Sequence, residues 1–348
     1  MAFDIGKRIG WSRLRDGDPA DHDVGPPAPV TQSSRVTSAG RQVMTAETVI
    51  SVRGLRMSYG DVQAVRGIDL EVRRGEVFAF LGPNGAGKTT TVEILEGYLK
   101  RAGGELSVLG VDPEHATADW RERVGVVLQE SVAEPDLTVR ECLSMYASYY
   151  GSPRGVDELI ELVGLTDKAG ARGESLSGGQ RRRLDVALAL VGDPELVFLD
   201  EPTTGFDPSA RRAAWEMIAG LQSLGKTIFL TTHYMEEAEY LADRIVVLAA
   251  GQIVGEGTPQ DLGGRDRAAT EISFALPLGF EPADLPAGLA VAVAADHHRH
   301  VALHTHSPTA ALGALTDWAR DNDLELADIE VHRPTLEEIY LRLTEGAP

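Results

Sequence analysis

Two kinds of hydrophobic pattern divide the chain. Short runs in which every residue is apolar, such as Val77–Leu81 and Leu196–Leu199, are typical of strands buried on both faces of a parallel sheet. Between Thr138 and Gly164, apolar residues recur instead at helical spacing, with a turn at Gly151–Pro153. Strands and helices in this order predict an α/β fold with a helical insertion.

Shorter patterns predict an antiparallel sheet ahead of the first buried run. Residues 50–59 and 62–72 are predicted to be strands, with turns at Gly60 and at Arg74–Gly75. Further along, the Gly-rich start and the apolar content of residues 103–112 predict a second hairpin. We therefore expect an antiparallel β flap beside the buried sheet.

The two ends of the chain differ from this central pattern over residues 47–265. Residues 1–46 lack sustained periodicity and predict a disordered extension, with a membrane-facing amphipathic helix over Ile5–Leu14 as the alternative. Past residue 267, patterns of strand, helix, strand and a final helix over TLEEIYLRLTE follow. Residues 268–348 are therefore predicted to form a small α+β accessory domain.

A glycine-rich segment follows the first buried strand and matches Gly-x-x-x-x-Gly-Lys-Ser/Thr. Its glycines let successive backbone N–H groups approach a triphosphate, while the helix that starts near Lys88 aims its positive end the same way. Lys88 adds a full charge near the β and γ phosphates, and Thr89 offers a hydroxyl to Mg²⁺. The predicted nucleotide contacts are Gly82, Pro83, Asn84, Gly85, Ala86, Gly87, Lys88, Thr89 and Thr90.

Polar residues follow three further predicted strands, where an open α/β sheet binds its ligands. Asp200 and Glu201 come after Leu196–Leu199, and adjacent carboxylates there suit a division of labour in which Asp200 organises Mg²⁺ and Glu201 takes a proton from the attacking water. Gln129 and His233 end two other strands, and His233 is a candidate contact for the γ-phosphate.

A second candidate anion site lies in LSGGQ, residues 176–180. The Gly-Gly turn opens an amphipathic helix with Ser177 as its candidate N-cap, so its amino-terminal amides could bind an anion. Tyr59, at a strand end before the Gly60 turn, could stack its ring on a nucleotide base, although a tyrosine in this position usually just packs.

Composition narrows the function classes. The 348 residues suggest two domains, and no window approaches the 18 or so consecutive apolar residues of a membrane span. A net charge of −20 argues against nucleic acid as a partner. The chain opens without an apolar secretory segment, and its single cysteine, Cys142, allows no internal disulfide.

Five histidines lie close together in the predicted accessory domain. Clustered histidines can ligate zinc, but Val301, Leu303 and Thr305 alternate with the more polar positions, which is the pattern of a strand with one wet face. We favour the strand over the metal site. The histidines are His297, His298, His300, His304 and His306.

Taken together, these motifs resemble the nucleotide-binding subunit of ATP-binding cassette (ABC) transporters, over about Val49 to Leu262. The LSGGQ segment and its spacing from Asp200-Glu201 carry the resemblance, and the departure is Phe206 where leucine is more usual. The resemblance implies a P-loop NTPase cassette with a mixed sheet core, an antiparallel β flap and a helical subdomain.

The family resemblance also implies roles for individual residues. Tyr59 resembles the aromatic that stacks on adenine, Gln129 the glutamine that reaches Mg²⁺ and senses the membrane partner, and Asp207 the aspartate that communicates across a dimer. His233 resembles the switch histidine on the γ-phosphate. The implied catalytic set is Lys88, Gln129, Glu201 and His233, and the implied metal ligands are Thr89, Gln129 and Asp200.

Partners follow from the same resemblance. Ser177, Gly178, Gly179 and Gln180 of one subunit would close on the ATP held by Lys88 of another, in a homodimer or beside a homologous cassette. A separate transmembrane permease would hold the chain at the cytoplasmic face of the membrane. The ending RPTLEEIYLRLTEG resembles drug-export and ABC-2-type cassettes, which favours export of a drug, lipid or other amphiphile.

Two alternatives remain at this point. A soluble ABC-type ATPase acting on ribosomes or DNA is disfavoured, because ribosome-acting members of the family carry two cassettes in one chain and DNA-acting members have a long coiled coil, whereas only 112 positions separate Lys88 from Asp200. A nucleotide sensor without turnover is disfavoured by the presence of Glu201 and His233.

Overall fold

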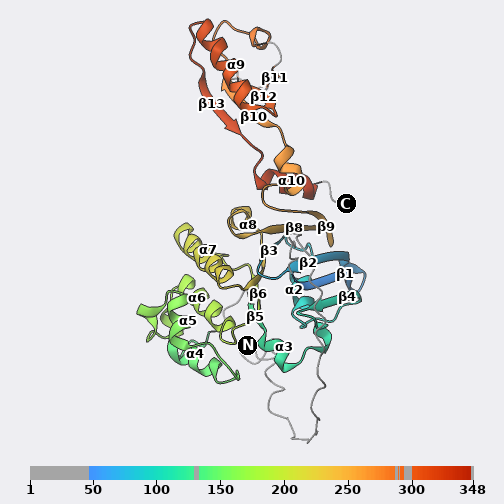
Figure 1. Cartoon of the computed structure of the whole chain (residues 1–348), viewed down its shortest axis with the longest axis vertical. Helices are drawn as coiled ribbons and strands as arrows, with labels where there is room; N and C mark the ends of the chain where they lie inside the picture. Colours follow the sequence, from blue (N-terminus) through green and yellow to red (C-terminus); the bar gives the residue numbers. More distant parts are fainter. Residues whose placement is uncertain (1–46, 129–132, 287–288, 290, 294–299, 346–348) are drawn as a thin grey trace, which may run out of the picture.

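A computed structural model describes residues 47–128, 133–286, 289, 291–293 and 300–345. The predicted extension over residues 1–46, together with Gln129, His297 and His298, lies outside these residues. Three sheets organise the described chain (Figure 1). A central sheet and an antiparallel sheet form the larger body, and a separate small sheet stands at the carboxyl-terminal end.

The central sheet has six strands in the order β5-β6-β7-β3-β8-β9, parallel except for the last pair. Its apolar runs are the buried strands that the sequence predicts. Because β3, β6 and β7 are parallel neighbours, their carboxyl ends meet at one edge. The strands are β3 (Val77–Leu81), β5 (Val124–Val127), β6 (Leu196–Asp200), β7 (Thr227–Thr232), β8 (Arg244–Ala249) and β9 (Gln252–Gly257).

Both faces of the central sheet are buried, because successive side chains of a strand point to opposite faces. One face carries Phe78, Phe80, Phe198 and Phe229, whose rings pack within 5.6 Å of the Phe229 ring. This face lies against the antiparallel sheet. The opposite face is covered by helices. Burying each such phenylalanine stabilises the fold by about 1.5–3 kcal/mol.

The antiparallel sheet has the order β2-β1-β4, with β1 (Thr48–Tyr59), β2 (Val62–Arg73) and β4 (Gly103–Val108). The predicted flap is confirmed, but the predicted hairpin over residues 103–112 is wrong. Only β4 is a strand, and it pairs with β1, since that strand offers a free edge. After β4 the chain turns at Leu109, and a single bridge joins Val108 to Val111.

The helical insertion occupies one side of the central sheet (Figure 1). Its α4 and α5 pack with α6 into one hydrophobic core with the sheet, which confirms the helical periodicity after Thr138. Thr138 begins α4 through a reciprocal cap with Glu141. The helices of the larger body are α2 (Lys88–Leu95), α3 (Ala118–Glu122), α4 (Val139–Ala147), α5 (Val156–Leu162), α6 (Gly178–Ala189), α7 (Pro208–Ser223) and α8 (Met235–Leu241). Short 3-10 turns lie at Pro113–His115, Thr166–Lys168, Gly173–Ser175 and Leu262–Arg267 (η5).

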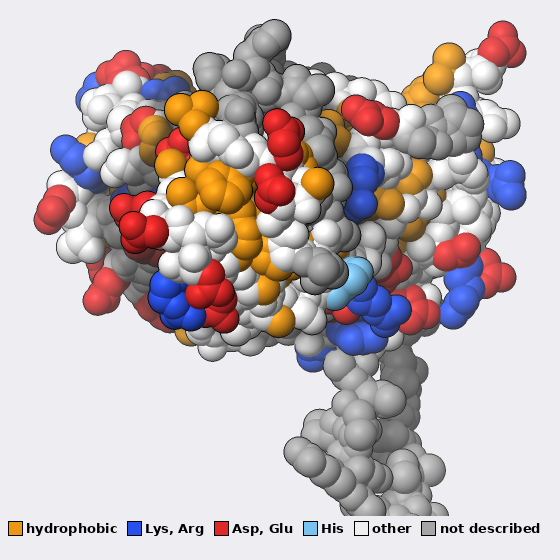
Figure 2. Space-filling model, turned by 90° about the horizontal axis from the view of Figure 1, so that it is seen from above, with side chains coloured by type: hydrophobic (Ala, Val, Ile, Leu, Met, Phe, Trp, Pro, Cys, Tyr) orange, Lys and Arg blue, Asp and Glu red, His pale blue; other side chains and the backbone are white. Residues whose placement is uncertain are grey.

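The carboxyl-terminal sheet is a separate four-stranded unit in the order β11-β12-β10-β13, covered on one face by α9. Viewed toward this end of the molecule (Figure 2), apolar side chains form an area among charged ones. The exposed large apolar residues of this unit include Leu278, Ile329 and Val331. Its elements are β10 (Thr270–Ala275), β11 (Val291–Val293), β12 (His300–Thr305), α9 (Pro308–Asp321), β13 (Ala327–His332) and a 3-10 turn at Pro282–Asp284.

The histidine-rich segment includes the strand β12. Val301 and Leu303 are buried under α9 while His304 is exposed, 4.0 Å from a carboxylate oxygen of Glu271 on the neighbouring strand. Among the residues described, no group of three or more metal-ligating side chains comes together.

The last helix, α10 (Leu336–Glu345), leaves the small sheet and packs on the larger body (Figure 1). Leu336 and Ile339 are each 1% exposed and share a core with residues of β3, α8 and β8. Arg265 fixes the return of the chain, since its Nε donates to the Pro334 carbonyl at 2.8 Å and its Nη1 to Glu239 at 2.7 Å. The described part of the segment 268–348 thus ends in a helix that completes the hydrophobic core of the larger body.

No helix in the described part of the chain combines the length and the apolar character needed to cross a membrane.

Candidate nucleotide-binding and hydrolysis site

The glycine-rich segment after β3 lies close against two other strands. A Cβ atom at Gly82 would meet the Leu248 carbonyl oxygen at 2.3 Å, and one at Gly87 would meet the Ala64 carbonyl oxygen at 2.3 Å. Gly87 also has φ +101°, which side chains disfavour. Both positions therefore require glycine, and the loop that leads into α2 has the geometry of a phosphate cradle.

Lys88, the first residue of α2, holds its charge inside this loop. It is only 6% exposed, and its Nζ donates to the carbonyls of Gly82 at 2.7 Å and Pro83 at 3.2 Å. Burial lowers the pKa of Lys88, and the carboxylates of Glu201 and Asp200 oppose that shift. Thr89 and the tip of the loop, residues 83–85, are exposed.

The two acidic residues at the end of β6 are held by the neighbouring strand. The Thr231 hydroxyl donates to Asp200 Oδ1, and the Glu201 backbone N–H donates to the Thr231 carbonyl at 3.1 Å. Glu201 has φ +46°, a left-handed conformation that costs a non-glycine residue roughly 1–2 kcal/mol. The surrounding hydrogen bonds offset this strain.

The Glu201 side chain points to the end of β7, where His233 follows the strand. Its Oε1 lies 3.2 Å from His233 Nδ1, and its Oε2 accepts a hydrogen bond from the Thr204 hydroxyl at 3.1 Å. A carboxylate beside an imidazole at a strand end can accept a proton from a nucleophile while the imidazole contacts an anion. Lys88, Asp200, Glu201 and His233 thus lie at one edge of the central sheet.

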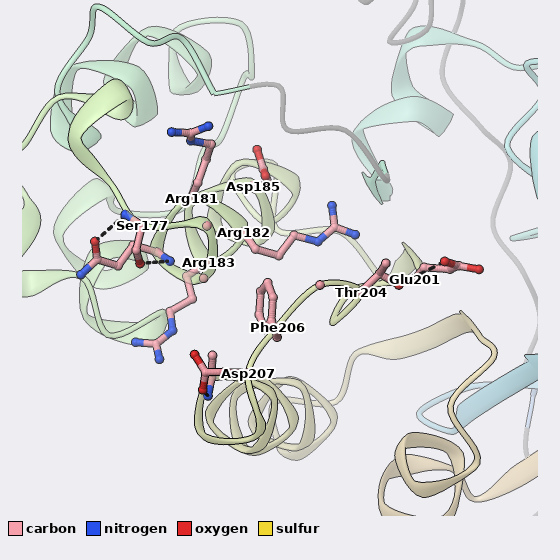
Figure 3. Close-up of a pocket in the computed structure, with 14 residues that line it drawn as sticks. Ser177, Arg181, Arg182, Arg183, Asp185, Glu201, Thr204, Phe206 and Asp207 are labelled. Carbon is pink, nitrogen blue, oxygen red and sulfur yellow. Dashed lines mark hydrogen bonds between the residues drawn. The ribbon is translucent and has the colours of Figure 1, made fainter.

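The LSGGQ segment lines a pocket of about 580 Å³ on the helical side of the molecule (Figure 3). Ser177 caps α6 by accepting from the Gln180 N–H at 3.3 Å, while the Gln180 side chain accepts from the Ser177 N–H at 3.0 Å. Asp207 caps α7, with its Oδ1 accepting from the N–H groups of Ser209 and Ala210. The pocket is lined by residues 177–183, Asp185, Glu201, residues 204–207 and Ala210.

Three other residues singled out in the sequence are Tyr59, Gln129 and Phe206. Tyr59 ends β1 with half of its surface exposed, as a ring available for stacking would be. Gln129 follows Leu128 and lies outside the described residues. Phe206 lines the LSGGQ pocket beside Asp207, so the bulkier side chain faces that pocket (Figure 3).

Sequence reasoning missed several residues that support this edge. The sequence shows that Thr231 is a polar residue two positions before His233. Its hydrogen bond to Asp200 could not be predicted, because it depends on the register in which β6 and β7 pair. Arg182 is part of the run Arg181–Arg183, and only the structure separates it from its neighbours by burial. Nothing in the sequence indicated that Glu237 is buried, because glutamates on helices are usually exposed.

Glu237 on α8 is a buried carboxylate, 0% exposed. Its Oε1 accepts hydrogen bonds from the Thr203 hydroxyl at 2.7 Å and the Trp215 indole at 3.0 Å. It thereby joins α8 to α7 and to the loop after Glu201. Burial raises the pKa of Glu237, and these hydrogen bonds oppose the shift.

We expect Glu237→Gln to remove a pH-dependent part of the stability. A carboxyl whose pKa is raised by folding is favoured by acid, so the contribution of Glu237 falls as pH rises from the ordinary glutamate range through its raised pKa. Gln keeps an acceptor without titrating. Urea unfolding over pH 4–8 should show a flatter profile for Gln than for the wild type. Glu237→Ala should lose about 1–3 kcal/mol, most of all at the acid end of this range, because two donors lose their partner. Identical profiles for Gln and wild type would contradict this view of Glu237.

A mixed sheet with a phosphate loop, an acidic pair and a histidine at its strand ends, together with a helical insertion and an antiparallel sheet, defines a P-loop nucleotide-hydrolysing cassette. Comparison with known proteins gives the family. The ABC transporter family model matches residues 65–204, and a model of an ABC transporter-like C-terminal domain matches residues 270–335.

Individual relatives belong to the same family. The chain is 39% identical over 307 residues to the daunorubicin resistance ATP-binding protein DrrA3 of Streptomyces coeruleorubidus, covering 86% of this chain and 96% of that protein. It is 46% identical over 219 residues to the Nod factor export ATP-binding protein I of Cupriavidus pinatubonensis, covering 62% of this chain and 67% of that protein. The chain belongs to the ATP-binding subunits of ABC transporters, and it is an ATPase of that family.

Solved structures share the fold. cbiO1 from Clostridium perfringens, part of an ABC transporter complex, matches with a TM-score of 0.56 and 28% identity over 62% of this chain and 90% of that one. A dimeric ATP-binding cassette bound to ADP and phosphate matches with a TM-score of 0.54 and 24% identity over 60% of this chain and 98% of that one. These matches confirm the predicted fold class.

Proposed function

We propose that this chain powers export of a drug, lipid or other amphiphile through a separate transmembrane permease, to which it binds at the cytoplasmic face of the membrane. The relatives named for Nod factor export and daunorubicin resistance support export. The observation that carries the mechanism is the grouping of Lys88, Asp200, Glu201 and His233 at one sheet edge. The ribosome- or DNA-linked alternative has no support from these relatives.

Within the site, we assign ATP to the phosphate loop, residues 82–90, with its adenine on Tyr59. Lys88 binds the terminal phosphates, because its ammonium group lies inside the loop, where Nζ donates to the Gly82 and Pro83 carbonyls. A phosphate in the loop would accept a hydrogen bond from the same charged group. Glu201 accepts a proton from the attacking water, and His233, 3.2 Å from Glu201, contacts the γ-phosphate. Gln129 completes this set as the link to the permease.

Mg²⁺ fits the donors at this edge, since it prefers hydroxyl, amide and carboxylate oxygens. Thr89 presents an exposed hydroxyl at the start of α2, and the Thr231 hydroxyl orients the Asp200 carboxylate. We therefore assign Thr89, Asp200 and Gln129 to the metal. Bound there, Mg²⁺ would neutralise charge on the phosphates.

We further propose that two cassettes act together, as a homodimer or with a homologous cassette. The LSGGQ pocket supports this, because the capped start of α6 lines it together with the partly exposed Arg181 and Arg183 on the helical side. Ser177, Gly178, Gly179 and Gln180 of one cassette would contact the ATP of the other, with Asp207 beside them. No nucleic acid takes part.

Replacing Lys88 tests the proposed function. In Lys88→Ala the loop loses a charge-assisted contact worth about 1.5–3 kcal/mol, so ATP should bind roughly 10- to 100-fold more weakly by equilibrium dialysis. The same variant should fail to restore efflux of an amphiphilic dye in cells that lack the gene for this chain. Lys100→Ala is the matched control, because Lys100 is exposed on the loop beyond α2.

Unchanged ATP affinity in Lys88→Ala would refute the site. Normal efflux with lost ATP binding would refute export as the function.

A further inference from the structure

Arg182 is a buried cation on α6, two residues past the LSGGQ segment. It is 8% exposed, and its guanidinium spans the gap between α6 and the central sheet. Nε donates to the Pro202 carbonyl at 3.2 Å, Nη2 donates to the Asp200 carbonyl at 2.7 Å, and Nη1 donates to the Leu128 carbonyl. All three acceptors are main-chain oxygens, at the carboxyl ends of β5 and β6.

Two of these acceptors enclose Glu201. The Asp200 carbonyl belongs to the peptide that precedes Glu201, and the Pro202 carbonyl belongs to the second peptide after it. Glu201 itself is in a left-handed conformation at φ +46°. A strained residue keeps its conformation only where the surrounding structure over-determines it. Arg182 supplies two of the bonds that fix this corner, and Thr231 supplies acceptors for the Glu201 N–H.

The chemistry of arginine suits this position better than that of lysine. A planar guanidinium presents several N–H donors in a fixed fork, so one side chain can bind three carbonyls that lie in different directions. The carboxylates of Asp185, Asp200 and Glu237 favour its positive charge against the effect of burial. A side chain that served only to fill space here would not need a charge that burial disfavours.

The same helix begins at the LSGGQ cap. Ser177 and Gln180 start α6, and Arg182 lies in its next turn, so the hydrogen bonds of one side chain join the first turns of this helix to the Glu201 corner. We propose that Arg182 is a positioning residue that couples the LSGGQ helix of a cassette to the Glu201 of that same cassette. Contact of α6 with the second nucleotide is thereby transmitted to hydrolysis of the first. This inference rests on the proposed role of Glu201.

The test separates positioning from folding. Arg182→Met keeps the length of the side chain and removes every donor, and Arg182→Lys keeps the charge without the fork. ATP affinity and KM should stay within about threefold of wild type, because the phosphate loop is untouched. kcat should fall roughly 30- to 100-fold in Met, in line with the effect of a misplaced catalytic group, and less in Lys. The Hill coefficient for ATP should fall toward one in Met.

Lys226→Met is the matched control for loss of a buried cation. Lys226 is 9% exposed and binds Asp193 at the opposite end of the sheet, so its loss should lower the unfolding midpoint without changing kcat. Arg182→Met could lower the unfolding midpoint as Lys226→Met does, while kcat and the Hill coefficient stay at their wild-type values. In that case Arg182 is structural and the inference is wrong. Equal losses of kcat and of ATP affinity in Arg182→Met would also overturn it.

Glu201→Gln, measured in parallel, separates this inference from the proposed function. Retained turnover in Glu201→Gln would overturn the role of Glu201 and the inference with it. Lost turnover in Glu201→Gln beside normal turnover in Arg182→Met would overturn the inference alone.

Discussion

Glu201→Gln is expected to bind ATP like the wild type and to lose turnover by roughly 10²- to 10⁴-fold, the range for removal of a general base. Gln has nearly the same shape and can still accept from the Thr204 hydroxyl, which lies 3.1 Å from the carboxylate. It cannot accept a proton from water at neutral pH. Binding and hydrolysis should therefore separate in this variant, as they do not in Lys88→Ala.

Trapped ATP should also reveal the assembly. With ATP and Mg²⁺, Glu201→Gln should elute as a dimer in size-exclusion chromatography, because unhydrolysed nucleotide stays between a phosphate loop and an LSGGQ segment. Adding Ser177→Ala should abolish the dimer, since it removes the cap of α6. Glu216→Gln on the exposed face of α7 is the control and should behave like wild type. A Glu201→Gln protein that hydrolyses ATP at the wild-type rate would refute the assignment.

Ile339→Ala and Leu336→Ala are each expected to destabilise the larger body by about 2–5 kcal/mol, although both lie at the carboxyl-terminal end of the chain. The side chains are 1% exposed and pack with Ala79, Leu262 and their neighbours. Removing them leaves a cavity in a close-packed core. Urea unfolding followed by the tryptophan signal should show the loss as a lower midpoint.

Leu341→Ala on the same helix is the matched control. Leu341 is 46% exposed, so its loss should change stability by no more than about 0.5 kcal/mol. Equal effects at Leu341 and Ile339 would show that α10 contributes helix content and not core packing.

Two deletions locate the boundary of the accessory unit. Truncation after Arg267 removes α10 and should destabilise the protein by at least as much as Ile339→Ala. Excising residues 268–333 and joining the ends with a short Gly-Ser linker should instead preserve ATP binding. This junction is feasible because the Arg265 side chain contacts the Pro334 carbonyl at 2.8 Å, which brings the two ends together.

Local pattern was enough to predict much of this site. The apolar runs before Gly82 and Asp200 define strands, and the polar residues that follow them must then lie at the sheet edge. What local pattern could not predict depends on long-range packing. The amphipathic sequence of α10 predicts a helix, but it does not predict the surface on which this helix packs. Likewise, β4 pairs with the free edge of β1 and forms no hairpin of its own, which the composition of residues 103–112 does not reveal.

Burial separates Arg182 from Arg181 and Arg183, which the sequence presents as one run. A helix turns by about 100° per residue, so of three consecutive arginines only one can face the sheet. Which one does depends on how α6 packs against β5 and β6, and that packing involves residues far apart in the chain. The same holds for Glu237, whose partners Thr203 and Trp215 lie 34 and 22 positions away.

The place of α10 in the core has a consequence for biosynthesis. Val247 and Ile339 belong to one hydrophobic cluster but are separated by about 90 residues, which translation at 5–20 residues per second takes roughly 5–20 seconds to add. During that interval the nascent chain carries an apolar face without its cover. A chain cut short by a premature stop or a protease keeps that face exposed, so cellular quality control can remove it before it occupies a place in a transporter.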